Sequence, residues 1–126
     1  MLDERENKRL SQLCSMRVER HFYTVMITLH GEFDCSCERA FREELGGALD
    51  EAKALVVDLQ ALKFIDSPGL RMLLALHGTA RDDGLDFTVL CDGSGGVRHV
   101  LRETGLDGVL PVVDDAGAVP ASDSPV

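Results

Sequence analysis

The run ALVVDL at residues 54–59 constrains the fold more than any other part of the sequence. It is short, almost entirely apolar and rich in β-branched side chains, which is typical of a strand buried on both faces. Such strands occur in parallel sheets that carry helices on their faces. A second buried strand is predicted over 87–91 and a last short strand over 109–113. Helical patterns separate these strands, so the sequence predicts an α/β fold with an open, mostly parallel sheet.

An antiparallel hairpin is expected to begin the sheet. Residues 13–18 and 22–30 are predicted strands, separated by the polar residues 19–21. The second strand is rich in aromatic and β-branched side chains that alternate between two faces, and it is expected to end at Gly31.

Three helices are predicted, over 36–52, 66–83 and 97–104. Apolar residues recur in the first helix at steps of three and four, although the Gly-Gly pair at 46–47 weakens the pattern. The element order is therefore β-β-α-β-α-β-α-β. Because crossovers between parallel strands are right-handed, the helices are expected to pack on the sheet.

The chain of 126 residues has room for one domain. We expect a charged, flexible N-terminal segment over 1–10, a folded domain over 11–113 and a disordered acidic tail over 114–126.

The net charge of −9 argues against partners that are themselves anionic. An acidic surface repels nucleic-acid phosphates and anionic lipid headgroups, so neither a nucleic acid nor a membrane is expected as partner. The charged start of the chain lacks the apolar stretch of a secretory signal, and no apolar run reaches the roughly 18 residues that span a bilayer. A cytoplasmic location is therefore expected.

Four cysteines are expected to be reduced: Cys14, Cys35, Cys37 and Cys91. Cys14 and Cys91 lie within apolar runs and are interpreted as core residues. Cys35 and Cys37 form a C-x-C spacing, which is neither the redox C-x-x-C nor half of a regular zinc site, and no metal or cofactor is predicted. A thiol-dependent enzyme that uses Cys35 or Cys37 stays an alternative, although the sequence holds no catalytic signature that would support it.

The segment from Asp58 to Leu70 carries the strongest functional signal. A buried strand ends near Leu59, a hydrophobic loop follows, and a helix opens at Asp66-Ser67-Pro68. Local chemistry alone favours a structural role in which Ser67 caps the helix and Pro68 is its first residue. The same position also suits a phosphorylation site, because the positive end of the helix dipole stabilises a phosphate.

The helix after Ser67 has two apolar faces. The residues expected to pack on the sheet share one of them: Leu70, Leu73, Leu74 and His77. Met72, Ala75 and Leu76 lie on the other side, where they form either an exposed docking surface for a partner or a contact with the neighbouring helix.

Two motifs resemble the signature of the STAS family, and in particular of bacterial anti-anti-sigma factors. Asp66-Ser67 and Gly69-Leu70 match the family's Asp-Ser-Ser/Thr-Gly-Leu at the start of a helix. Residues 31–34, Gly-Glu-Phe-Asp, are similar to the family's Gly-Glu-Leu-Asp after the second strand. The resemblance covers about residues 11–113, and two motifs in register are stronger evidence than one.

This resemblance implies a binding protein without catalytic activity, a monomer or weak dimer that switches partners. Its unphosphorylated form would bind an anti-sigma factor, which is also a serine kinase with a histidine-kinase-like fold, and so free a sigma factor. The kinase would phosphorylate Ser67 and end the binding, and a serine phosphatase would reverse the modification. The predicted partner-binding residues are Asp34, Asp66, Gly69, Met72 and Leu76.

Two features depart from the family pattern. Pro68 stands where the family has a second Ser or Thr, so a hydroxyl and a backbone N–H are missing at the helix start. The tail is also a poor candidate for the family's last helix. A scaffold or transporter-associated STAS protein that works without phosphorylation therefore stays an alternative.

Overall fold

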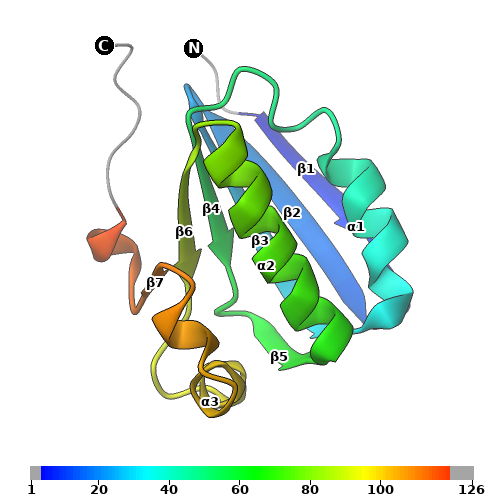
Figure 1. Cartoon of the computed structure of the whole chain (residues 1–126). Helices are drawn as coiled ribbons and strands as arrows, with labels where there is room; N and C mark the ends of the chain where they lie inside the picture. Colours follow the sequence, from blue (N-terminus) through cyan, green and yellow to red (C-terminus); the bar gives the residue numbers. More distant parts are fainter. Residues whose placement is uncertain (1–3, 120–126) are drawn as a thin grey trace.

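A computed structural model describes residues 4–119 and contains one mixed sheet (Figure 1). The strands run in the order β1-β2-β3-β4-β6-β7, and β5 pairs with the end of β3. The strands are β1 (Glu4–Arg9), β2 (Cys14–His21), β3 (Thr24–Phe33), β4 (Ala54–Asp58), β5 (Leu62–Ile65), β6 (Asp86–Leu90) and β7 (Val112–Val113). The first three strands pair antiparallel and all other pairs are parallel. The predicted α/β fold with an antiparallel start is confirmed.

Three α-helices accompany the sheet: α1 (Glu38–Leu45), α2 (Ser67–Asp82) and α3 (Gly96–Glu103). Helices α1 and α2 lie over one face of the sheet and contact each other, while α3 packs beside β5 (Figure 1). Short 3-10 helices follow β3 (Cys35–Cys37), α3 (Leu106–Gly108) and β7 (Ala116–Ala118). No helix within residues 4–119 is both long enough and apolar enough to cross a membrane.

Strand β4 is buried as the ALVVDL run predicts. Its first four residues are all buried, and only Asp58 at its end is partly exposed. Leu55 and Val57 join the main core under the helices, together with Ile27 of β3 and Leu73 of α2. Parallel neighbours on both sides satisfy the backbone of β4, because β3 and β6 pair with it along its whole length.

The prediction of a flexible segment over 1–10 is wrong for residues 4–9. These residues form β1, which pairs antiparallel with β2 from Glu4↔Arg20 to Arg9↔Ser15. A charged sequence suits an edge strand, since charges discourage the free edge from pairing with another chain. In the predicted disordered tail, residues 116–118 form a 3-10 turn, and residues 120–126 lie outside the described chain.

Gly31 is a bulge within β3, and the prediction that it ends the strand is wrong. Its φ is +92°, and a Cβ built there would lie 2.0 Å from the carbonyl oxygen of Leu13. Only glycine fits this conformation and this close approach. The register shifts between Gly31 and Glu32, after which β3 pairs with β5 through Phe33↔Ile65. The predicted hydrophobic loop over 62–65 is therefore a strand.

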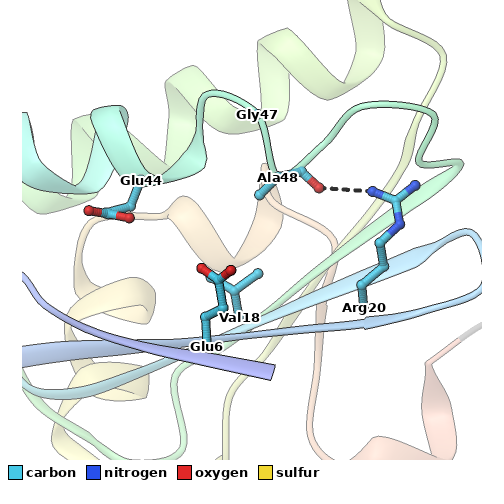
Figure 2. Close-up of a pocket in the computed structure, with 6 residues that line it drawn as sticks. All are labelled: Glu6, Val18, Arg20, Glu44, Gly47 and Ala48. Atoms are coloured by element: carbon cyan, nitrogen blue, oxygen red, sulfur yellow. Dashed lines mark hydrogen bonds between the residues drawn. The ribbon is translucent and has the colours of Figure 1, made fainter. Parts of the chain in front are cut away.

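Helix α1 ends at Leu45, seven residues before the predicted end. The Gly-Gly pair and the residues after it form turns, and Arg20 of β2 donates a hydrogen bond of 3.1 Å to the carbonyl oxygen of Ala48. Figure 2 shows this bond beside a cavity of about 310 Å³ between β1, β2 and the end of α1. Lys8 Nζ lies 3.6 Å from a carboxylate oxygen of both Glu6 and Glu44, and the pair with Glu44 links β1 to α1 across the surface.

Candidate functional site

Asp66 caps helix α2. Its backbone is extended, and its side-chain Oδ1 accepts a hydrogen bond of 2.9 Å from the Gly69 backbone N–H. Ser67 is the first helical residue and Pro68 the second. The prediction that Ser67 caps the helix and Pro68 begins it is therefore wrong by one residue. Aspartate and serine are equally good N-caps, and proline is tolerated anywhere in the first turn where no amide is required.

The hydroxyl of Ser67 is left available because Asp66 does the capping. Ser67 is exposed, and its hydroxyl forms no hydrogen bond with any other residue in the range 4–119. Ser36, two residues after the Gly-Glu-Phe-Asp motif, is also exposed, but its hydroxyl is bound to the carboxylate of Asp34. Of these two serines, Ser67 is the one with a hydroxyl free to react.

The two sequence motifs meet at Asp66. Its Oδ2 accepts a hydrogen bond of 3.2 Å from the backbone N–H of Cys35, and its own N–H donates to the carbonyl oxygen of Phe33 at 3.3 Å. Pairing between β3 and β5 brings the ends of these strands together. Asp66 therefore holds the segment after β3 against the start of α2.

Asp34 caps the 3-10 helix that follows β3. Its Oδ1 accepts hydrogen bonds from the hydroxyl and from the backbone N–H of Ser36. These bonds stabilise the carboxylate, so the pKa of Asp34 falls below its ordinary value of 3.8. The charged Asp34 thus stabilises the 3-10 helix Cys35–Cys37, the same segment whose first N–H donates to Asp66.

Gly69 allows α2 to sit close to the sheet. A Cβ at this position would lie 2.6 Å from Cγ1 of Ile65 and 2.9 Å from Cδ1 of Phe33. The residue is buried, so Gly69 offers no side-chain surface for contact with a partner. Its absence of a side chain fixes the approach of the helix to the ends of β3 and β5.

Of the two alternatives for this side of α2, the exposed docking surface is not formed by Met72 and Leu76, which are buried; Ala75 between them is exposed. Met72 and Leu76 are each only 5% exposed. They line a groove of about 520 Å³ between α1 and α2, together with Leu45 and Leu49. The alternative of contact with the neighbouring helix is confirmed, because α1 packs on this side of α2.

An exposed stripe of α2 instead begins at Ser67 and continues through Arg71 and Leu74, residues that follow one another at helical spacing. Leu74, which was expected to pack on the sheet, is 37% exposed. Phe64, three residues before Ser67 in β5, is 47% exposed. We call Ser67, Arg71 and Leu74 the Ser67 stripe. Neither Arg71 nor Leu74 is among the predicted site residues, although their spacing of four and seven residues from Ser67 could have revealed them.

The cysteines are free thiols, and three of them are buried. Cys14 and Cys91 are core residues as predicted, and burial raises the pKa of Cys14 to about 12 and that of Cys91 in the same direction. Thiols with raised pKa are poor nucleophiles at neutral pH. Cys37 is fully buried and donates a weak hydrogen bond to the Ser11 hydroxyl at 3.5 Å, whereas Cys35 is exposed. Residues 4–119 contain no group of three or more side chains placed to hold a metal ion.

Comparisons with known proteins agree with this geometry. A protein-family profile described as "Mlab, STAS domain" matches residues 16–113. An anti-sigma F factor antagonist of Paenibacillus polymyxa is 26% identical over 102 residues, covering 79% of this chain and 86% of that protein. The anti-sigma-F factor antagonist RsfB of Mycobacterium tuberculosis is 31% identical over 94 residues, covering 74% of this chain and 75% of that protein.

A solved structure is similar to this chain in both fold and sequence. The crystal structure of an anti-sigma factor antagonist from Mycobacterium paratuberculosis superposes with a TM-score of 0.68 at 28% identity, covering 82% of this chain and 88% of that one. The profile match spans most of the chain and includes both motifs. The chain therefore belongs to the STAS-domain family, and the relatives that it matches are named anti-sigma factor antagonists.

Proposed function

We propose that this protein is a cytoplasmic anti-sigma factor antagonist that is switched by phosphorylation at Ser67. The unphosphorylated form binds an anti-sigma factor, which is also a serine kinase with a histidine-kinase-like fold, and a sigma factor is released. The observation that carries the proposal is the free, exposed hydroxyl of Ser67 at the first position of α2. The names of the relatives support the choice of partner.

The switching reaction is a phosphoryl transfer from ATP bound to the partner. The Oγ atom of Ser67 attacks the γ-phosphorus, the bond between that phosphorus and the bridging oxygen of ADP breaks, and ADP leaves. The hydroxyl proton passes to a base of the kinase. A serine phosphatase later hydrolyses the phosphate ester with water and restores the hydroxyl.

The fold tolerates this modification because the phosphate is added outside the core. Phosphorylation adds about −1.5 to −2 charges at neutral pH, and the positive end of a helix dipole stabilises such a charge. Since Ser67 is exposed, the phosphate displaces no packed side chain. Its effect falls on the Ser67 stripe, where a doubly charged group would have to be desolvated when a partner docks.

Asp34 and Asp66 are proposed to act on partner binding through the shape of the two segments that they hold. Both carboxylates are occupied by backbone N–H groups, those of Ser36 for Asp34 and of Gly69 and Cys35 for Asp66. Met72 and Leu76 support the exposed stripe from beneath, because they pack α2 against α1. Direct contact is proposed for Ser67, Arg71 and Leu74.

Incubation with the purified anti-sigma kinase and ATP, followed by peptide mass analysis, tests the proposal. One phosphate on Ser67 is expected, and none in Ser67→Ala. Ser94→Ala is the matched control, since this exposed serine lies outside both motifs and should not affect labelling. Phosphate on another residue, or no phosphate, contradicts the mechanism. A thiol-dependent enzyme would instead lose its function in Cys35→Ala and keep it in Ser67→Ala.

A STAS scaffold that works without phosphorylation is a second candidate, favoured by Pro68. Proline at the second position of α2 removes one backbone N–H that could bind a phosphate. In a scaffold, Ser67→Asp would bind the partner as tightly as the unmodified protein. In the proposed switch, this substitution weakens the binding.

A further inference from the structure

The backbone at the start of α2 has little capacity to bind a phosphate on Ser67. Pro68 has no N–H, the Gly69 N–H donates to Oδ1 of Asp66, and the Leu70 N–H donates to the Asp66 carbonyl oxygen, both at 2.9 Å. Helix N-termini usually bind anions through these free amides. Here the amides at the second, third and fourth helical positions are absent or already bonded. At most the N–H of Ser67 itself is left for a phosphate, so a side-chain partner is needed to balance its charge.

Negative charges around Ser67 increase the need for a cationic side chain beside the phosphate. The Asp66 carboxylate is adjacent to Ser67 in sequence. The Asp34 carboxylate belongs to the segment after β3 that is hydrogen-bonded to Asp66. The whole chain carries a net charge of −9. Two cations lie close in sequence, namely Lys63 in β5 and Arg71 in α2, and both are exposed.

Arg71 has the better geometry of the two. It follows Ser67 by four residues, which places it about one helical turn further along the same face. It forms no ion pair or hydrogen bond with any other residue in the part of the chain that the structure describes. An acidic group four residues before a basic one is the favourable order on a helix, and a guanidinium can bind two phosphate oxygens at once.

We infer that Arg71 binds the phosphate of phosphorylated Ser67 and serves as its internal counter-charge. The inference rests on the proposed phosphorylation of Ser67. Phosphorylation would then change the Ser67 stripe in two ways. It adds a phosphate at Ser67, and it pairs the Arg71 guanidinium that the unmodified stripe presents to its partner. The modified stripe differs from the unmodified one at Ser67 and at Arg71.

A phosphate titration tests this inference without kinase or anti-sigma factor. Phosphoserine is incorporated at position 67 during synthesis of the full chain, and the second phosphate pKa is followed by phosphorus NMR. An ordinary phosphoserine titrates near about 6. With Arg71 bound, the pKa of the phosphate is expected to be about half a unit lower than it is in Arg71→Gln.

Arg81→Gln is the matched control, since Arg81 is also exposed on α2 but lies near its other end. It should leave the phosphate pKa unchanged, as should Lys63→Gln. An unchanged pKa in Arg71→Gln, or a larger change in Lys63→Gln than in Arg71→Gln, overturns the inference. Because the phosphate is introduced without the kinase, a negative result for Arg71 can be distinguished from a failure of the kinase to phosphorylate Ser67.

Discussion

The backbone N–H of Cys35 donates a hydrogen bond of 3.2 Å to Oδ2 of Asp66, across 31 positions of sequence. The other oxygen of the same carboxylate caps α2 by accepting from Gly69. One side chain therefore links the segment that follows β3 to the helix that presents Ser67. This link brings the two motifs together at one edge of the sheet.

Removal of the Asp66 carboxylate is expected to loosen this surface. Asp66→Ala should lower the free energy of unfolding by about 1 kcal/mol, the usual cost of a lost N-cap, as measured by urea denaturation. Asp82→Ala, at the other end of α2, is the control. It should leave stability equal or slightly higher, because a negative charge is unfavourable at a helix C-terminus. Equal losses in the two variants would contradict the capping role.

Replacement of Gly69 tests the close approach of α2 to the sheet. Gly69→Ala should lower the free energy of unfolding by about 1–3 kcal/mol, because the added Cβ overlaps Ile65 and Phe33. Gly78→Ala is matched to it within the same helix, where no atom lies within 4 Å of the new Cβ. That variant should gain up to about 1 kcal/mol from helix propensity. Similar changes in both variants would show that packing at Gly69 is not tight.

Leu74 and Met72 should separate partner binding from stability. Leu74→Ala is expected to weaken anti-sigma factor binding about tenfold and to change the free energy of unfolding by less than about 1 kcal/mol, since the side chain is partly exposed. Met72→Ala should cost about 2–5 kcal/mol of stability because it leaves a cavity between α1 and α2. Calorimetric titration and thermal melts measure the two effects, and a reversed pattern would contradict the assignment of the Ser67 stripe.

The charge on Asp34 makes its segment sensitive to acid. The pKa of Asp34 is lowered in the folded protein, so its stabilising effect is complete above the ordinary value of 3.8. That effect is lost as the pH falls through the lower folded pKa. Ser36→Ala removes the hydroxyl donor and should move the pKa of Asp34 back up toward 3.8, as followed by NMR of the carboxyl carbon. A titration unchanged by this substitution would rule out the Ser36 hydroxyl as a cause.

The sequence predicted the sheet well because its strongest signals were local. The apolar, β-branched run of β4 is recognisable from its own residues, without knowledge of the neighbouring strands. Strand β5 was missed because its four residues are buried, exposed, exposed and buried, which matches neither strand nor helix periodicity. Strand β1 was missed because pairing with β2, rather than any apolar face, makes it a strand.

The site was predicted in outline but not in detail. Ser67 and Asp66 are adjacent and both are good caps, so only the backbone shows which one begins the helix. The burial of Met72 and Leu76 depends on where α1 packs, and local periodicity cannot tell one apolar side of α2 from the other. The link between Cys35 and Asp66 required the parallel pairing of β3 with β5.

The affinity of the purified anti-sigma factor for three forms of this protein tests whether Ser67 is a switch. We expect tight binding of the unmodified protein and at least tenfold weaker binding of Ser67→Asp and of the form phosphorylated at Ser67. The melting temperatures should be nearly equal, because a negative group suits the start of α2. Equal affinity of all three forms for the anti-sigma factor would contradict a switch at Ser67.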